Sequence, residues 1–449
     1  MPALVWFRQD LRLHDHPALI AAAAEGEVIP VYVLDDEGPG AWRIGAAQRW
    51  WLHHSLSALD ASLREIGSRL ILRRGRAATV VREVAEACGA EAVHAIRHYE
   101  PWWREAEEAL GERLCSHEGN HLRPPESVRT GGGGQFRMFS AFYRALSAMM
   151  PPETPIDAPK HIKAPEQWPK SDALADWDLL PTKPDWATGF NVWTPGEAGA
   201  QTALDDFEHA VDAYEEARNL PAVEGTSRLS PHLHHGEISP RQIWEALTSR
   251  GAGVESFRRE LAWRDFTSGL ILALPDYADR NGRPRFDRLK WRHAPSDLKA
   301  WQQGRTGYPI VDAGMRQLWE TGWMHNRVRM IAASFLVKHL LINWRDGERW
   351  FWDTLVDADY GNNSVNWQWV AGTGIDANMF GRIMAPLSQS AKFDAAEYIR
   401  EWVPELRNVS DAAIHDPEES GCRPSGYPRK IIGHRDARER ALAAGRQVR

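Results

Sequence analysis

Short apolar runs alternate with longer stretches of helical periodicity over the first 125 residues. The apolar runs are Ala3–Phe7, Val28–Leu34, Leu70–Leu72 and Ala92–Ile96. Stretches with apolar residues at helical spacing lie between them, at Ala46–Ile66, Ala78–Cys88 and Glu105–Cys115. Strands that alternate with helices in units of about 30 residues form parallel sheets with helices on both faces. The pattern therefore predicts a doubly wound α/β domain over residues 1–126.

The segment after the first predicted strand is rich in charged and polar residues. Phe7–Pro17 reads FRQDLRLHDHP. Because ligands of open parallel sheets bind beyond the carboxyl ends of the strands, this segment is a candidate site.

Residues 127–200 are predicted to be a long interdomain connector. This region contains a glycine run, Gly131–Gly134, and nine of the chain's 28 prolines lie between positions 151 and 195. Proline fixes φ and removes a backbone donor, so we expect mainly loop, with one helix at Met138–Met149.

From about residue 200 onward the apolar positions recur at helical spacing. The predicted helices are Ala203–Arg218, Pro240–Arg250, Ser256–Ala273, Pro309–Thr321, Met324–Leu341 and Glu348–Val356. Ser239 before Pro240 has the form of an N-cap followed by proline in the first helical turn. The pattern predicts an all-α domain over residues 201–449.

Composition narrows the functional classes. The 449 residues carry 54 basic and 61 acidic side chains, a net charge of −7, which does not by itself indicate nucleic-acid binding. Residues 221–449 hold 32 basic and 28 acidic side chains, so a local basic patch is compatible with the sequence. The 22 tryptophans fit a large aromatic core, but also stacking on flat ligands or electron transfer.

Cysteine content and hydropathy indicate the expected compartment. The three cysteines, Cys88, Cys115 and Cys422, are too few and too scattered for a disulfide framework. No apolar stretch reaches the length of about 18 residues that a membrane span needs, and the N-terminus has no signal-peptide pattern. We therefore expect a cytoplasmic protein, in a bacterial cytosol, without a membrane partner.

Two motifs resemble metal-binding or phosphate-binding sequences, but we interpret neither as a binding site. His232, His234 and His235 lack a Cys or carboxylate partner at ligand spacing, so we expect exposed or capping histidines and no metal. The glycine run is not followed by Lys-Ser/Thr, so it is expected to be a flexible loop.

Other segments favour a pocket for an anionic, planar ligand. Gly225–Ser230 reads GTSRLS and offers hydroxyls, backbone amides and Arg228, which suit a pyrophosphate. Asp357–Trp369 reads DADYGNNSVNWQW and supplies amides that both donate and accept. Met324–Met330 adds two guanidinium groups beside Asn326. Each segment alone could be an ordinary polar loop or cap, but together they suggest a site for a large heterocycle.

Taken together, these segments resemble the photolyase/cryptochrome flavoprotein family over nearly the whole chain. The matching segments are VWFRQDLRLHDHPAL (5–19), PAVEGTSRLSPHL (221–233), ELAWRDF (260–266), TGYPIVDAGMRQLWETGWMHNRVRM (306–330), SFLVKHLLINWRDGERWF (334–351), DADYGNN (357–363) and WQW (367–369). The resemblance is strongest to bacterial photolyases that act on cyclobutane pyrimidine dimers, with the class III branch as one possibility.

The resemblance implies an N-terminal antenna domain and a helical domain that holds FAD. It implies a lyase for UV-damaged DNA, in which reduced flavin excited by blue light lends an electron to a flipped-out dimer and then recovers it. It also implies a monomer. The alternative within the family is a cryptochrome-type blue-light photoreceptor without repair activity. A dark flavin oxidoreductase is disfavoured, because no nicotinamide-binding fingerprint is present.

Site residues follow from the resemblance, position by position. The residues matched to FAD binding are Tyr214, Thr226, Ser227, Arg228, Leu229, Ser230, Arg329, Asp357, Asp359 and Asn363. Asn363 matches the position that faces flavin N5, where a second carboxylate would be repelled by a reduced, anionic flavin. The residues matched to lesion binding or catalysis are Glu260, Trp263, Asn326, Met330 and Trp369. Arg218 and Arg327 match groups near the DNA backbone.

Further roles follow in the same way. Glu260 would donate a hydrogen bond to the dimer's carbonyl oxygens, for which a raised pKa is expected. Trp367, Trp344 and Trp291 match the three-tryptophan chain that photoreduces oxidised FAD. Together with a C-terminal tail of only about 40 residues (410–449), Glu260, Met330 and Asn363 favour repair over signalling.

An antenna chromophore is expected, but its identity stays open. Tyr99-Glu100 is followed by Pro101, Trp102 and Trp103, where folate-binding relatives commonly show a polar Asn-Glu pair. Methenyltetrahydrofolate is favoured by similarity to class III members; a deazaflavin, FMN or no antenna remain alternatives. Three cysteines are too few for the four ligands of the iron–sulfur branch.

Overall fold

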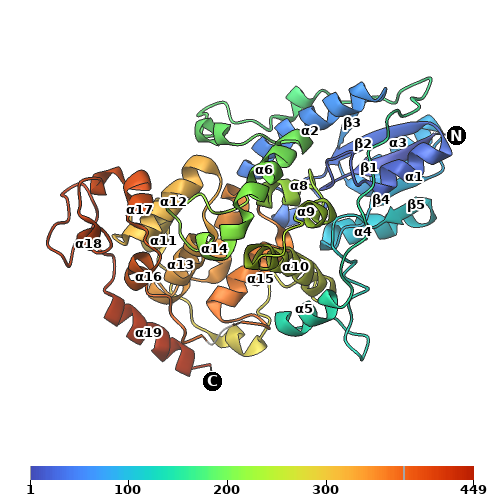
Figure 1. The fold of residues 1–449 in the computed structure, drawn as a ribbon. Helices are drawn as coiled ribbons and strands as arrows, with labels where there is room; N and C mark the ends of the chain where they lie inside the picture. The colour runs from blue at the N-terminus through green and yellow to red at the C-terminus, as the bar shows by residue number, and fades with distance from the viewer. Residues whose placement is uncertain (1, 378–379, 449) are drawn as a thin grey trace.

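The computed structural model describes residues 2–377 and 380–448. Within them, the first part of the chain is an α/β layer structure and the remainder is helical, as the blue and the green-to-red segments of Figure 1 show. The predicted fold class, α/β followed by all-α, is confirmed.

Within the described residues, five parallel strands form one sheet in the order β3-β2-β1-β4-β5. The strands are β1 (Ala3–Phe7), β2 (Val28–Leu34), β3 (Ile71–Arg74), β4 (Val93–Ile96) and β5 (Leu114–His117). The strands β1, β2 and β4 are buried along their length, which is why β1 and β2 are apolar throughout and β4 is apolar except at His94. The fifth strand was missed, because the helical pattern predicted at Glu105–Cys115 runs into β5.

Helices cover both faces of this sheet, as the doubly wound pattern predicted. They are α1 (Pro17–Glu25), α2 (Ala46–Glu65), α3 (Ala77–Cys88) and α4 (Pro101–Leu110). Side chains of α1 and α2 pack in one hydrophobic cluster with β1 and β2, whereas α3 and α4 contribute to a separate cluster on the other face. Alternate residues of each central strand therefore point into different cores.

The connector is less featureless than predicted. It contains α5 (Phe139–Ser147), which confirms the helix expected at Met138–Met149, and short 3₁₀ turns at Leu174–Trp177 and Thr188–Val192. Phe190 and Trp193 are buried against side chains of α2. The connector thus contributes to the hydrophobic packing between the two parts of the molecule.

The helical part follows the connector. Its helices are α6 (Glu197–Ala210), α7 (Tyr214–Ala217), α8 (Ser230–His235), α9 (Pro240–Ala246), α10 (Ala252–Ala273), α11 (Pro295–Gln302), α12 (Pro309–Thr321), α13 (Asn326–Ser334), α14 (Trp344–Thr354), α15 (Tyr360–Ala371), α16 (Pro386–Lys392), α17 (Ala396–Trp402), α18 (Asp411–Ile414) and α19 (His434–Arg446). The predicted helix at Ala203–Arg218 is divided, because α6 ends at Ala210. The helix predicted at Met324–Leu341 is α13 continued by a π-helical turn at Phe335–His339.

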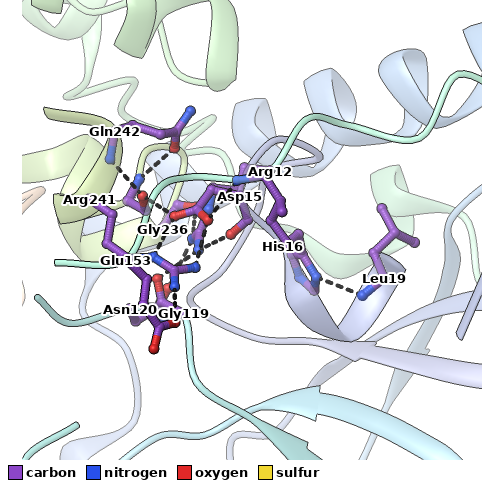
Figure 2. Close-up of polar contacts among 12 residues, drawn as sticks. Arg12, Asp15, His16, Leu19, Gly119, Asn120, Glu153, Gly236, Arg241 and Gln242 are labelled. Carbon is purple, nitrogen blue, oxygen red and sulfur yellow. Dashed lines mark hydrogen bonds and ion pairs between the residues drawn. The ribbon is translucent and has the colours of Figure 1, made fainter. Parts of the chain in front are cut away.

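The loop between β1 and α1 joins the sheet to the helical part (Figure 2). The buried guanidinium of Arg12 donates to Asn120 Oδ1 at 2.9 Å and to the carbonyl oxygen of Gly236, which follows α8, at 2.9 Å. Asp15 forms a buried ion pair with Arg241 of α9 at 2.6 Å. The ligand site that the sequence predicted at Phe7–Pro17 stays a prediction, and Arg12 and Asp15 of this segment also join the two parts of the protein.

Candidate functional site

The main cavity of the helical part has a volume of about 510 Å³ and lies between α7, α8, α10, α13 and α15. It brings together residues up to 156 positions apart in the sequence, from Tyr214 to Val370. The predicted site residues that line it are Tyr214, Arg218, Thr226, Ser227, Arg228, Ser230, Glu260, Trp263, Asn326, Arg327, Arg329, Met330, Asp357, Asp359, Asn363, Trp367 and Trp369. Leu229, Trp344 and Trp291 do not line it.

The segment that precedes α8 is held in a tight turn. Arg228 has φ of +54°, an unusual value for a residue other than glycine, and its guanidinium lies 4.1 Å from the ring centroid of Trp323. The side chain of Leu229 is fully buried, so it anchors the turn in the core. Hydroxyl groups of Thr226, Ser227 and Ser230 are thereby presented along one wall of the cavity.

A bidentate ion pair fixes the next part of the wall. Arg329 on α13 donates to both carboxylate oxygens of Asp357, at 3.0 and 2.8 Å. Ser230 Oγ, at the start of α8, donates to the same carboxylate at 2.7 Å. The pair therefore links α8, α13 and the segment that leads into α15, and the Asp357 side chain is almost fully buried.

The N-terminus of α15 supplies the polar side chains beside this pair. Asp359 caps the helix by accepting a hydrogen bond from the backbone N–H of Asn362. Burial raises the pKa of Asp359 above its ordinary value. Asn363 donates from Nδ2 to the carbonyl oxygen of Glu348 at 3.0 Å, so α14 sets the orientation of its amide.

The open side of the cavity carries aromatic and charged side chains. Trp263 on α10 and Trp369 on α15 are each partly exposed there. Glu260 accepts a hydrogen bond from Arg218 Nη1 at 2.6 Å. Because Glu260 is the acceptor in this pair, a donor role for Glu260 toward a ligand requires that the pair open.

A second hollow of about 520 Å³ adjoins the main cavity. It shares Arg327, Met330 and Trp369 with it and adds Arg382 and Lys392. Arg327 lies with its guanidinium 4.6 Å from the ring centroid of Phe393. Cationic and aromatic side chains thus extend from the cavity mouth along the surface. Part of the positive charge of the mildly basic second half of the sequence is concentrated there.

The three tryptophans predicted to transfer electrons differ in depth. Trp367 lines the cavity, and its ring packs against Gly347 of α14. Trp344, at the first position of the same helix, is fully buried and donates from Nε1 to Asn281 Oδ1 at 3.0 Å. Trp291 is partly exposed at the edge of the core. An electron path through these three rings stays a prediction.

The three histidines of the PHLHH segment are not exposed, so that part of the prediction is wrong. Each is at least 95% buried, because α8 lies between the helical part and α2. Their ring nitrogens contact Glu237, Gln48 and the carbonyl oxygen of Val356, and Trp51 stacks on His235. In the part of the chain that the structure describes, no cluster of three or more His, Cys, Asp or Glu could hold a metal ion.

Several lining residues were not among the predicted site residues, for example Leu233, His234, Arg264 and Trp323. Arg264 lies one residue after Trp263, and its guanidinium donates to the carbonyl oxygens of Asn120 and Leu233. The ELAWRDF motif contained it, but nothing in the local spacing separates a cavity-lining arginine from a surface one.

Glu100, at the N-terminus of α4, is an acid buried near the cavity. Burial raises its pKa to about 7, and the neighbouring Asp359 adds to the rise. An unfolded glutamate titrates at about 4.3, so the folded state binds the proton more tightly. Ionisation of Glu100 therefore lowers the free energy of unfolding as pH rises from about 4 through about 7.

We expect Glu100→Gln to remove this pH dependence. The variant and the wild type should unfold with similar free energy below pH 4, and the variant should be more stable by about 3–4 kcal/mol at pH 8. Thermal or urea unfolding of both proteins across this pH range measures the difference. A stability difference that does not change with pH would contradict the assignment.

The fold and the cavity together define a class: a parallel α/β sheet joined to a helical domain with a cavity lined by hydroxyl, charged, amide and aromatic side chains. Comparison with known proteins identifies the family. Residues 3–160 match the family described as DNA photolyase, and residues 257–447 match the FAD binding domain of DNA photolyase. The chain belongs to the photolyase/cryptochrome family.

Individual relatives agree with this assignment. The deoxyribodipyrimidine photo-lyase of Agrobacterium fabrum is 48% identical and aligns over 99% of this chain and 97% of its own. A bacterial class III photolyase from Agrobacterium tumefaciens has a TM-score of 0.95 at 47% identity, covering 100% of this chain and 97% of the other. An archaeal photolyase from Sulfolobus tokodaii, solved with two FAD molecules, has a TM-score of 0.86 at 32% identity and covers 100% of both chains.

The residues of the cavity fit FAD. The hydroxyls and Arg228 suit a pyrophosphate, and Asp359 and Asn363 suit the polar edge of a flavin. Phe257 and Leu261 add apolar wall. Among the described residues, no helix is long and apolar enough to cross a membrane.

Proposed function

We propose that this protein is a light-driven DNA repair enzyme that splits cyclobutane pyrimidine dimers. The observation that carries the proposal is the cavity itself: the partly buried Arg329–Asp357 pair lines one side of it, and Trp263 and Trp369 lie at its open side. The near full-length similarity to a deoxyribodipyrimidine photo-lyase supports the same reaction. The substrate is UV-damaged DNA, and the reaction is that of a carbon–carbon lyase.

FAD, once bound and reduced, supplies the light-excited electron that opens the cyclobutane ring and takes that electron back, so no net oxidation occurs. We assign the hydroxyls of Thr226, Ser227 and Ser230 to its phosphates. Asp357 and Arg329 hold the ring side of the cofactor site, and Asn363, oriented by Glu348, presents an amide rather than a second carboxylate to it. An amide at that place avoids repulsion with a negatively charged ring.

The open side of the cavity would receive the flipped dimer. The indole rings of Trp263 and Trp369 offer flat apolar faces. Stacking of a flipped base on such faces offsets the free energy lost when the base leaves the duplex stack. Met330 and Asn326, near the mouth, would contact the edge of the lesion, and Arg218 and Arg327 the phosphates on either side. The adjoining basic hollow supports this path for the strand.

Glu260 is proposed to donate a hydrogen bond to the dimer's carbonyl oxygens. We expect Glu260→Ala to keep its FAD and to photoreduce normally, yet to repair with a yield lower by about two- to tenfold, the range that one hydrogen bond represents. Glu255→Ala, on the same helix and exposed, is the matched control. Repair per absorbed photon measures the effect, and an unchanged yield in Glu260→Ala contradicts the role.

A second chromophore is proposed for the N-terminal part, with methenyltetrahydrofolate as the favoured molecule and a deazaflavin or FMN as the alternatives. A photolyase of the same fold was solved with a second FAD. The absorption spectrum of the purified protein, and mass spectrometry of what it releases, distinguish these molecules.

A repair assay tests the proposed function. Chemically reduced protein is mixed with an oligonucleotide that carries one thymine dimer, and parallel samples are kept dark or under blue light. We expect loss of the dimer in the illuminated sample alone. A flavin-containing protein that photoreduces but leaves the dimer intact would contradict repair and point to the photoreceptor alternative.

A further inference from the structure

The indole ring of Trp263, at the mouth of the cavity, stacks on a second aromatic ring. The ring of Phe139 lies parallel to it, with the centroids 3.6 Å apart and the planes 7° from parallel. Phe139 is the first residue of α5 and comes from the region that the sequence marked as a connector. Since Phe139 covers one face of the indole, the opposite face is the one available to a ligand in the cavity.

Phe139 is itself held from several sides. Its side chain is only 3% exposed, and its backbone N–H donates to Asp376 Oδ2 at 2.8 Å. Phe266, one turn after Trp263 on α10, meets both rings edge-on, with centroid distances of 5.7 and 5.5 Å. The contact between α5 and α10 is visible in Figure 1, where the two helices lie side by side.

This arrangement fixes the plane of the indole before any ligand arrives. A tryptophan with both faces open can rotate about its side-chain torsions, and ordering it on binding costs free energy. A parallel aromatic neighbour removes that freedom and adds a stacking contact of its own. A flat ligand then meets a preformed wall, whereas contacts to DNA phosphates do not depend on the indole plane.

We propose that Phe139 is a positioning residue that fixes the lesion-facing plane of Trp263 and so sets the preference for dimer-containing over undamaged DNA. The proposal rests on the proposed function, in which Trp263 stacks on the flipped dimer. It assigns to the connector a part in substrate selection in addition to its packing role.

The chain offers a matched control on the same helix. Phe142 is also 3% exposed, and its ring contacts Phe136, Phe139 and Phe266, with no ring contact to Trp263 among the described residues. Phe139→Leu and Phe142→Leu therefore remove a buried aromatic ring from one helix, but only the first uncovers the indole.

The experiment measures binding in the dark to an oligonucleotide with one thymine dimer and to the same oligonucleotide without it. We expect Phe139→Leu to raise the Kd for the dimer by about fivefold, the order of one aromatic stacking contact, and to leave the Kd for undamaged DNA unchanged. Phe139→Tyr, which keeps a ring, should restore the affinity, and Phe142→Leu should bind as the wild type. Flavin content and melting temperature establish that each variant is folded. If Phe139→Leu does not fold, Phe139→Met is measured in its place.

Equal shifts in Phe139→Leu and Phe142→Leu, or equal weakening for both oligonucleotides, would overturn the proposal. The variant Trp263→Ala distinguishes a failure of the proposal for Phe139 from a failure of the proposed function. If Trp263→Ala binds the dimer as tightly as the wild type, the stacking role of Trp263 is wrong. If Trp263→Ala loses affinity while Phe139→Leu does not, only the role of Phe139 is wrong.

Discussion

Protein in which Asp357 is replaced by alanine should be purified almost free of FAD. The Asp357 carboxylate is 3% exposed and satisfies both Arg329, by two hydrogen bonds, and Ser230. Its removal leaves the Arg329 guanidinium without its partner in a largely buried place, and breaking a buried pair in this way costs about 3–5 kcal/mol. We expect FAD affinity to fall by at least about a hundredfold, because the wall formed by α8 and α13 loses its shared anchor.

The ratio of flavin to protein absorbance after purification, and titration of the stripped protein with FAD, measure this effect. Asp411→Ala is the matched control, because it removes the carboxylate of an exposed arginine–aspartate pair with Arg400 and should change nothing. Asp357→Asn, which keeps the hydrogen-bond acceptor but not the charge, should fall between the two. Full flavin content in Asp357→Ala would show that this pair does not organise the cofactor site.

The second large effect is expected at Trp344. A phenylalanine at this buried position keeps most of the packing but is much harder to oxidise, so an electron-transfer chain that passes through it is interrupted. We expect Trp344→Phe to slow photoreduction of the oxidised flavin by at least about tenfold, a barrier increase of about 1.4 kcal/mol or more. The visible absorbance of the flavin, followed under blue light with an external reductant, gives the rate.

Repair by the same variant after chemical reduction should match the wild type, since this chain serves photoreduction and not the splitting of the dimer. Trp177→Phe is the control: Trp177 is also buried, and its Nε1 also donates to a side-chain oxygen, that of Asp172, but it lies in the core beside the sheet. If Trp344→Phe photoreduces at the wild-type rate, the electron path does not use Trp344. If the pre-reduced variant cannot repair, Trp344 has another role.

The local sequence pattern was sufficient to predict the fold class and several of the helices and strands. Val28–Leu34 is apolar at nearly every position because both faces of β2 are covered, and the α/β class followed from such runs. Pro309–Thr321 was predicted to the residue, because Pro309 at its first position and Gly322 just after its last position mark its two ends. The motifs GTSRLS, MHNRVRM and DADYGNN also contain nearly half of the residues that line the cavity.

The errors have a common physical origin, which is contact between segments far apart in the chain. The histidines of α8 looked like surface residues, yet Gln48 and Trp51 of α2 bury them. In the loop at Phe7–Pro17, Arg12 donates to Asn120 and to Gly236 after α8, partners that the sequence pattern did not indicate. Neither outcome is encoded in local spacing.

The amino-acid sequence alone determined the elements, the family resemblance and the chemical types at the site, since periodicity and motif order are local properties of the chain. Tertiary structure alone decided which groups meet. It pairs Glu260 with Arg218, couples Asn363 to Glu348 and lays Phe139 against Trp263, 124 positions away. A side chain's partner, and hence its charge state and orientation, depends on distances that only the packed fold fixes.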